Sequence, residues 1–288
     1  MLFFLFDSLS VTIGCIKMTK QSIYFTHANG IPGQTYQKFL SYFQSEFNVK
    51  YIPYIGLDAS YPVTAKWAYL VKQIIEDIEL KFPQQKVIGL GHSFGSLLTL
   101  MCAYKRPDLF SQVIMMDPPF IIGAKSPLFE LIQKLDLSIA NKFTPAGITL
   151  KRRDHWASEQ EAYDSLRHNR LFKDFDEQCF QDFMQIGIQV DSERGGVTLT
   201  IPKKLEAEIF KTVPAWWWRT PRKAPKVPVQ LVTSKHSHFY KQGLPQTIYK
   251  TYGIKYSVVD GSHMFPLEHP EKIAGHVKQL IYADIKKA

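Results

Sequence analysis

The chain is predicted to fold as an α/β protein with a mostly parallel, doubly wound sheet, because short apolar runs alternate along it with longer runs of helical spacing. The apolar runs lie at residues 23–26, 50–55, 86–90 and 111–116, and the helical runs at 34–47, 64–82 and 96–105. Strands joined by helices of this length form parallel sheets with right-handed crossovers. A Gly-x-Ser-x-Gly pattern at residues 91–95 stands between one strand and the next helix. Such a turn is a position at which these sheets carry a nucleophile.

Residues 1–20 are interpreted as an extension that precedes the fold. Their apolar run is too short to span a bilayer, Asp7 stands where a signal peptide carries positive charge, and no small-residue cleavage site follows. These features predict a cytoplasmic protein. A second methionine, Met18, opens a stretch that leads directly into the first strand, so we expect residues 1–17 to be dispensable or, alternatively, to add a short first strand.

Composition excludes several kinds of site. The chain has 288 residues, of which 45% are hydrophobic and 21% charged, enough for one α/β core with an insertion. Its three cysteines form no Cys-x-x-Cys pair, which argues against a disulfide framework or a zinc site. His236 and His238 form a His-x-His pattern without an evident third ligand. We therefore expect no metal and no cofactor.

The formal net charge of +9 is concentrated in one segment. Residues 209–259 contain seven lysines, two arginines and no acidic residue, and the remaining 26 basic residues balance the 26 acidic ones. A charge confined to one segment does not predict a nucleic-acid partner. We interpret this segment as a solvated face. Pro214, Pro221 and Pro225 interrupt its charges, so no continuous amphipathic helix is expected to lie on a membrane.

Ser93 is the predicted nucleophile. It lies in Gly91-His92-Ser93-Phe94-Gly95, where a sharp turn raises the hydroxyl above the sheet edge and places a helix N-terminus beside it. Gly91 and Gly95 allow the turn to close against its neighbours, where a Cβ atom would collide. The pattern alone could also occur by chance in a loop. His92 is interpreted as a turn residue.

The loop after the first strand, residues 27–33, is the expected second half of an oxyanion hole. Backbone N–H groups of Ala28 and Asn29, with that of Phe94, are candidates to hold the negative charge that develops on a carbonyl oxygen. The Asn29 side chain could add a further donor. Alternatively, Asn29 only satisfies its own backbone in a turn.

Four landmarks of the chain together resemble the α/β-hydrolase superfamily. They are His27-Ala28-Asn29-Gly30, the turn at residues 91–95, Asp117-Pro118-Pro119 and Gly261-Ser262-His263. The resemblance extends over residues 21–282 and implies an α/β-hydrolase core at 21–119 and 222–288. The antiparallel strands that usually precede the first parallel strand have almost no room in this chain.

Between residues 120 and 221 the alternation of strands and helices stops. Helical runs at 128–140 and 179–186, a Gly195-Gly196 turn and three adjacent tryptophans at 216–218 occupy this stretch. By resemblance to the superfamily, residues 120–221 are expected to form a helical cap that lines an acyl pocket and excludes water. The tryptophans are expected to pack at the junction between cap and core, or in part against substrate or lipid.

The remaining members of a catalytic triad follow from the resemblance. His263 lies between the strand predicted at 256–259 and the helix at 270–285, where it can take the proton of Ser93. In most of the superfamily the acid follows the strand that here spans 229–233, but no acidic residue is present there. Some members carry it after the strand that follows the nucleophile's helix, which implies Asp117. The alternatives are that Asp117 caps a helix, that Asp260 serves instead, or that no acid takes part.

The resemblance implies a serine hydrolase that acts on a small or medium uncharged ester, with a small-molecule acyl substrate as its partner. Thioester cleavage, C–C bond hydrolysis and serine haloperoxidase-like activity would use the same residues. A catalytically idle protein that binds a small molecule in the capped pocket is the alternative from another class.

Overall fold

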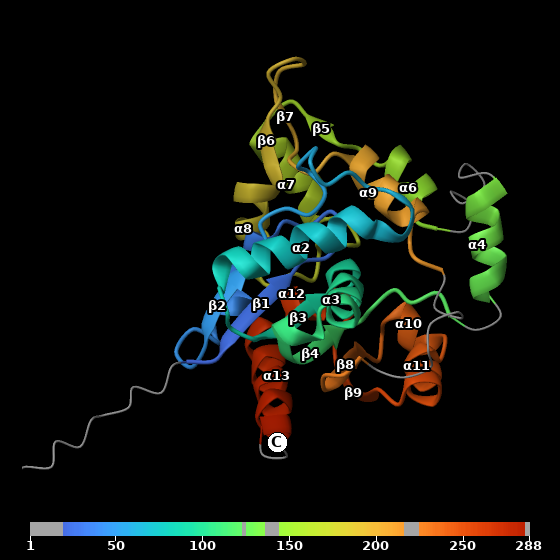
Figure 1. Cartoon of the computed structure of the whole chain (residues 1–288). Coiled ribbons are helices and arrows are strands. Elements are labelled where there is room, and N and C mark those ends of the chain that lie inside the picture. Colours follow the sequence, from blue (N-terminus) through green and yellow to red (C-terminus); the bar gives the residue numbers. More distant parts are fainter. Residues whose placement is uncertain (1–19, 123–124, 136–143, 216–224, 286–288) are drawn as a thin grey trace, which may run out of the picture.

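A six-stranded sheet forms the centre of the protein (Figure 1). The computed structural model describes residues 20–122, 125–135, 144–215 and 225–285. All the strand pairs of this sheet are parallel, in the order β2-β1-β3-β4-β8-β9, which confirms the predicted α/β class. The strands are β1 (Ser22–Thr26), β2 (Asn48–Tyr51), β3 (Val87–His92), β4 (Phe110–Met116), β8 (Val229–Ser234) and β9 (Lys255–Val259).

Helices cover both faces of the sheet, and each face has its own apolar core. Alternate residues of the strands pack against helices α2 (Ala68–Lys81), α3 (Phe94–Lys105) and α11 (Leu244–Tyr252) on one face. The other face packs against α1 (Gln37–Ser41) and α13 (Pro270–Ile285). Because both faces are covered, the inner strands β1 and β3 are buried along their whole length.

Two of the predicted elements near the start of the described chain differ from the observed ones in extent. The strand predicted at 50–55 is β2, which starts at Asn48 and ends at Tyr51, shortly before Pro53. Proline has no N–H group to donate to a neighbouring strand, which explains the early end. The helix predicted at 34–47 is a 3-10 helix, η1 (Gly33–Tyr36), followed by the short α1, after which the backbone continues in turns.

The chain between β4 and β8 forms an insertion that gathers beyond one end of the sheet (Figure 1). Its helices are α4 (Lys125–Leu135), α6 (Ala146–Lys151), α7 (Glu159–Arg167), α8 (Glu177–Gly187) and α9 (Lys203–Lys211). An antiparallel sheet of β5 (His155–Trp156), β7 (Val197–Leu199) and β6 (Ile188–Val190) was not predicted. Strands of two or three residues are too short to show an alternating pattern in sequence. The predicted Gly195-Gly196 turn connects β6 to β7, with both residues at positive φ.

Several predictions concern residues outside the described ranges. They are the role of residues 1–17, the packing of the tryptophans at 216–218 and the boundary of the insertion at 221. In the part of the chain that the structure describes, no helix combines the length and the apolar composition needed to cross a membrane.

The tight packing of the turn after β3 makes Gly95 a test of the fold. A Cβ atom at Gly95 would lie 2.4 Å from the Thr26 carbonyl oxygen and 2.5 Å from that of His27, both fixed backbone atoms. We expect Gly95→Ala to lower the free energy of unfolding by about 2 kcal/mol through overpacking.

Gly275→Ala is the matched control, because a Cβ atom there meets nothing within 4 Å. In the middle of α13 this substitution should stabilise the protein by up to about 1 kcal/mol through helix propensity. Urea unfolding of both variants measures the difference, and equal stabilities would show that the turn is not closely packed.

Candidate active site

Ser93 lies at the tip of the turn between β3 and α3. Its φ of 52° and ψ of −121° place it in a region that L-residues rarely adopt, a strained geometry that needs support from its surroundings. Part of that support is a hydrogen bond of 2.7 Å from the Ser93 N–H to the Met116 carbonyl oxygen at the end of β4. A Cβ atom on Gly91 would lie 2.5 Å from Ser96 Cα, so only glycine allows the helix to start so close to the strand.

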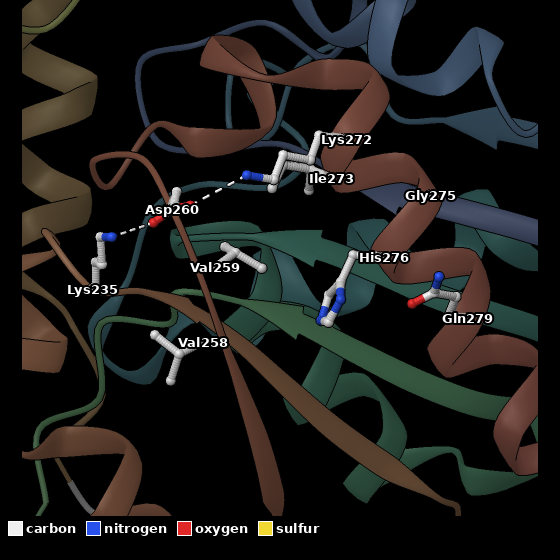
Figure 2. A pocket seen from close by; sticks show the side chains of 9 residues that line it. All are labelled: Lys235, Val258, Val259, Asp260, Lys272, Ile273, Gly275, His276 and Gln279. Carbon is white, nitrogen blue, oxygen red and sulfur yellow. Dashed lines mark hydrogen bonds and ion pairs between the residues drawn. The ribbon is translucent and has the colours of Figure 1, made fainter.

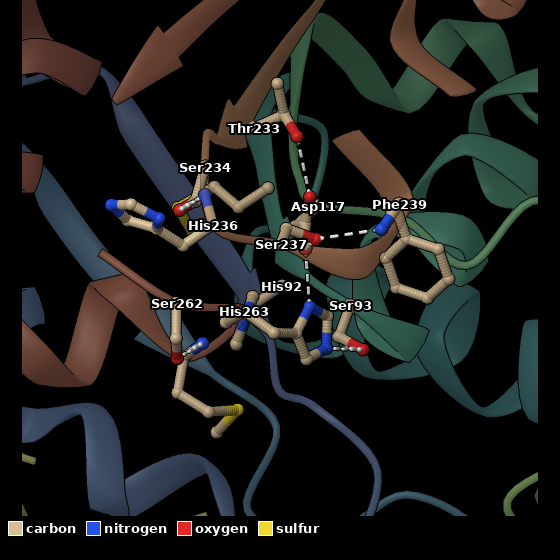
Figure 3. A network of polar contacts seen from close by, with 12 residues as sticks. His92, Ser93, Asp117, Thr233, Ser234, His236, Ser237, Phe239, Ser262 and His263 are labelled. Atoms are coloured by element: carbon tan, nitrogen blue, oxygen red, sulfur yellow. Dashed lines mark hydrogen bonds and ion pairs between the residues drawn. The ribbon is translucent and has the colours of Figure 1, made fainter. Parts of the chain in front are cut away.

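His263 joins Ser93 to Asp117 in a continuous chain of hydrogen bonds (Figure 3). Its Nε2 atom lies 2.8 Å from Ser93 Oγ, and its Nδ1 atom lies 2.5 Å from Asp117 Oδ2. Because a carboxylate accepts hydrogen bonds, Nδ1 carries the proton of the ring and donates a hydrogen bond to Asp117. This leaves Nε2 free to accept the hydrogen bond of the serine hydroxyl. The structure therefore brings the three predicted catalytic residues together.

The loop that carries His263 is held on several sides. The Ser234 hydroxyl donates a hydrogen bond to the Gly261 carbonyl oxygen, and the Ser262 N–H donates to Glu268 Oε2 at 2.7 Å. Gly261 has a φ of +113°, and a Cβ atom on it would lie 2.8 Å from Phe265 Cβ. These contacts fix the backbone directly before His263 and limit how far its ring can move.

Asp117 is almost completely buried, with 1% of its surface exposed, and its carboxylate is fully engaged by hydrogen-bond donors. Thr233 Oγ1 donates to Asp117 Oδ1 at 2.7 Å, and Ser237 Oγ donates to Oδ2 at 2.5 Å, beside the bond from His263. The backbone N–H of Asp117 donates to the Val232 carbonyl oxygen at 2.8 Å. A buried carboxylate needs such partners, because an unpaired one costs several kcal/mol.

Thr233 and Ser237 are functional candidates that the sequence did not identify. They lie at the end of β8 and at the start of α10 (His238–Lys241), the place where a triad acid was expected and not found. The ring of Phe239, also from α10, packs edge-on against His263 with centroids 5.4 Å apart. The sequence signal for this role was the presence of two hydroxyl side chains where most of the superfamily carries the triad acid.

Asp260 lies apart from this chain of hydrogen bonds. It lies at the edge of the sheet, where its carboxylate contacts Lys235 Nζ at 2.5 Å and Lys272 Nζ at 3.2 Å (Figure 2). Hydrogen bonds from Lys235 and Lys272 hold the pKa of Asp260 below its ordinary value. These residues line a pocket of about 400 Å³ that neither Ser93 nor His263 lines. The acid in contact with His263 is Asp117 and not the alternative Asp260.

The candidate oxyanion donors come from two segments beside Ser93, the start of α3 and the loop after β1. The N–H of Phe94 belongs to the first turn of α3, where backbone donors have no acceptor within the helix. The loop that follows β1 lies against this turn, because the Thr26 and His27 carbonyl oxygens surround Gly95. The backbone of Asn29 belongs to this loop.

The structure gives one other predicted donor a different partner. The side-chain amide of Asn29 donates to the Glu206 carbonyl oxygen at 3.0 Å, so it ties the loop to the insertion. The backbone N–H groups of Ala28, Asn29 and Phe94 therefore stay the candidates to bind an oxyanion.

Glu206 of the insertion covers the Asn29-Gly30 turn. Its carboxylate accepts two hydrogen bonds from Arg152, at 3.2 and 2.6 Å, and it occupies the space beside Gly30 where a Cβ atom would lie 2.7 Å from Oε2. Burial raises the pKa of Glu206, and the Arg152 charge opposes that shift. The insertion therefore contacts the Asn29-Gly30 turn through both the backbone and the carboxylate of Glu206.

His92 has a larger role than that of a turn residue, which corrects the interpretation from sequence. It is fully buried; its Nδ1 atom lies 2.6 Å from the Tyr36 hydroxyl, and its Nε2 atom lies 2.9 Å from the His263 carbonyl oxygen. The sequence offered no sign of these contacts, because Tyr36 is 56 positions and His263 is 171 positions away.

The His-x-His pattern lies at the start of α10, where His238 is the first residue of the helix. The His238 ring is hydrogen-bonded to the side chain of Gln242 at 2.8 Å. Within the described ranges, no group of three or more His, Cys, Asp or Glu side chains is arranged to hold a metal ion.

Sequence comparison relates the chain to hydrolases. The family model described as Alpha/beta hydrolase family matches residues 55–276. The chain is 25% identical over 223 residues to the uncharacterized hydrolase YugF of Bacillus subtilis (strain 168), covering 74% of this chain and 70% of that protein. It is 30% identical over 140 residues to the type I acyl-CoA thioesterase mpaH of Penicillium brevicompactum, covering 41% of this chain. The matched part is 29% of that relative's length.

Solved structures share the fold at low sequence identity. The peroxisomal alpha-beta-hydrolase Lpx1 of Saccharomyces cerevisiae is similar with a TM-score of 0.75 and 16% identity, over 94% of this chain and 79% of that chain. The thioesterase domain from the curacin biosynthetic pathway is similar with a TM-score of 0.68 and 18% identity, over 90% and 91% of the two chains. At such identities the likeness establishes the fold alone.

The Arg152–Glu206 pair can be tested by stability. We expect Arg152→Ala to lower the free energy of unfolding by about 3 kcal/mol at pH 7, because it leaves a buried carboxylate without its counter-charge. Arg153→Ala is the neighbouring control: Arg153 pairs with exposed Glu161, so its loss should change stability by less than about 1 kcal/mol. Adding Glu206→Gln to Arg152→Ala should restore most of the loss, since a neutral amide replaces the unpaired charge.

The pH dependence of the Arg152→Ala variant has a definite sign. Burial raises the pKa of Glu206 in the folded state above its ordinary value of 4.5, so the folded state binds a proton more readily than the unfolded state. The free energy of unfolding therefore falls as the pH rises from 4.5 through the raised pKa of Glu206. Urea unfolding at graded pH should show the deficit of the variant shrinking toward pH 4.5, and a deficit independent of pH would contradict this account.

Proposed function

The chain belongs to the alpha/beta hydrolase family, and we propose that it is a serine hydrolase that cleaves a small or medium uncharged carboxylic ester through an acyl-enzyme. The observation that carries the proposal is the hydrogen-bond chain Ser93–His263–Asp117, with distances of 2.8 and 2.5 Å. A nucleophile in contact with a base that is oriented by a third group is the arrangement that activates a serine hydroxyl.

In the first half of the reaction, Ser93 Oγ attacks the carbonyl carbon of the ester while its proton moves to His263 Nε2. The negative charge that develops on the carbonyl oxygen is held by the N–H groups of Phe94 and Asn29. The tetrahedral intermediate collapses when the C–O bond to the leaving alcohol breaks, and His263 gives its proton to that alcohol. Ser93 is left as an acyl ester.

In the second half, water enters in place of the alcohol. His263 takes a proton from the water as its oxygen attacks the acyl carbon, and the proton then returns to Ser93 Oγ as the carboxylic acid leaves. During both steps Asp117 stabilises the positively charged ring of His263. Thr233 and Ser237 keep the Asp117 carboxylate in place through their hydroxyls.

Thioester hydrolysis is a second candidate, and the comparisons favour it specifically. One sequence relative is named as an acyl-CoA thioesterase and one structural neighbour as a thioesterase domain. The chemical steps are the same with a thiol as the leaving group. A matched series of oxygen esters and thioesters of graded acyl length would separate the two candidates by kcat/KM.

The location of the protein stays a prediction. We propose the cytoplasm. A relative named as a peroxisomal membrane protein, 30% identical over 121 residues, offers the alternative. Microscopy of the full chain carrying a C-terminal and, separately, an N-terminal fluorescent tag would distinguish the two.

Ser93 is expected to be the residue that becomes acylated. A fluorophosphonate probe should label the protein, and Ser93→Ala should abolish both the labelling and the hydrolysis of p-nitrophenyl esters. Ser45→Ala, at an exposed serine, is the control and should be labelled like the wild type. A folded wild-type protein that takes no label and turns over no ester would instead favour a small-molecule-binding protein on this fold.

Asp117→Asn is expected to lower kcat by about 10⁴ while the protein stays folded, because the amide imposes the wrong tautomer on His263. Asp260→Asn is the matched control, and it should keep wild-type kcat, since Asp260 contacts only lysines at the edge of the sheet. Steady-state kinetics with circular dichroism as a check of folding provides the comparison. Wild-type turnover in Asp117→Asn would exclude Asp117 as the triad acid.

A further inference from the structure

A second chain of hydrogen bonds reaches His263, through side chains that take no part in the proposed reaction. The hydroxyl of Tyr36 lies 2.6 Å from His92 Nδ1, and His92 Nε2 lies 2.9 Å from the carbonyl oxygen of His263. Both Tyr36 and His92 are fully buried, with 0% of their surface exposed. This contact involves the backbone of His263, whereas the ring of the same residue contacts Ser93 and Asp117.

The direction of every hydrogen bond in this chain is determined. A carbonyl oxygen only accepts hydrogen bonds, so His92 Nε2 carries the proton of the ring and donates a hydrogen bond to the His263 carbonyl oxygen. In the neutral ring Nδ1 then accepts, so the Tyr36 hydroxyl donates to it. Burial lowers the pKa of His92 to about 3, so the ring is neutral at pH 7.

The chain connects the three segments that would have to be aligned for catalysis. Tyr36 ends η1, the 3-10 helix that directly follows the predicted oxyanion loop. His92 directly precedes Ser93, and the last acceptor is the backbone of His263 itself. We propose that Tyr36 and His92 are positioning residues that keep His263 and the oxyanion loop at the distance that acyl transfer needs. This inference rests on the proposed function, which it deepens.

The packing around the two rings explains why their polar atoms matter. Tyr36 packs against Phe25 with ring centroids 4.7 Å apart, and His92 packs against Phe265 at 6.0 Å. Apolar side chains of similar size could fill the same space without needing partners. What the hydroxyl and the imidazole add is a defined direction toward the His263 carbonyl oxygen, which apolar contacts do not provide.

The test is Tyr36→Phe, which removes one hydroxyl and keeps the ring. We expect kcat for p-nitrophenyl esters to fall about tenfold with KM unchanged, because a small displacement of a catalytic group slows chemistry more than binding. The rate of fluorophosphonate labelling should fall by the same factor. Tyr24→Phe is the matched control: Tyr24 is also fully buried and loses a hydrogen bond of 2.5 Å to Asp77, on the other face of the sheet. It should lower thermal stability at wild-type kcat.

Two variants of His92 separate the effect of its hydrogen bond to His263 from the effect of its packing. Gln places an amide N–H near the position of Nε2 and can still donate to the His263 carbonyl oxygen, whereas Leu cannot donate. We expect His92→Gln to keep most of the activity that His92→Leu loses. Equal losses in Gln and Leu, or wild-type kcat and labelling rate in Tyr36→Phe, would overturn the inference.

A readout independent of turnover keeps this inference separate from the proposed function. The ¹⁵N resonances of the His263 ring report its hydrogen bonds to Ser93 and Asp117, and we expect them to shift in Tyr36→Phe but not in Tyr24→Phe. If the wild type takes no fluorophosphonate while these resonances still respond to Tyr36→Phe, the proposed function fails and the positioning role stands. If the wild type is labelled and the resonances do not respond, the positioning role fails alone.

Discussion

The close approach of the Ser93 turn to its neighbouring strands is the constraint on which the rest of the site depends. The N–H of Ser93 bonds to the Met116 carbonyl oxygen, and Gly95 touches the carbonyl oxygens that end β1. Both contacts are possible because β1, β3 and β4 are parallel, so their carboxyl ends meet at one edge. The strained backbone of Ser93 is stable only while these neighbours hold it. The same contacts bring Asp117, one residue beyond β4, within reach of the histidine loop.

The position of the acid on β4 changes how the site is built around it. A carboxylate buried to 1% exposure must find donors for its oxygens, and the adjacent strand β8 supplies them through Thr233 and the loop that follows with Ser237. The strand that would usually carry the acid thus carries its hydrogen-bond donors. The carboxylate that contacts His263 follows β4, and the hydroxyl of Thr233 that holds it comes from β8. The position of the carboxylate therefore depends on the pairing of β4 with β8.

Two further contacts connect the oxyanion loop to elements far from it in sequence. The Asn29 side chain attaches the loop to Glu206 of the insertion, whose carboxylate pairs with Arg152. The Tyr36–His92 pair connects η1, which follows the loop, to the backbone of His263. The loop therefore lies between contacts to the insertion and contacts to the core.

The parallel α/β fold, the turn at Ser93 and the candidates His263 and Asp117 could all be predicted from the sequence. These features have local signals: the period of apolar residues, glycines at two fixed positions, and an acid or a histidine directly after a strand. The sequence did not predict the three-stranded sheet of the insertion or the hydroxyls that donate to Asp117. Nor did it predict the partner of the Asn29 side chain or the contacts of Tyr36 and His92. Those depend on side chains that are brought together only when the strands pair and the insertion folds back. No local pattern encodes a contact between residues 171 positions apart, such as that of His92 with His263. Such contacts can be identified only in the folded structure.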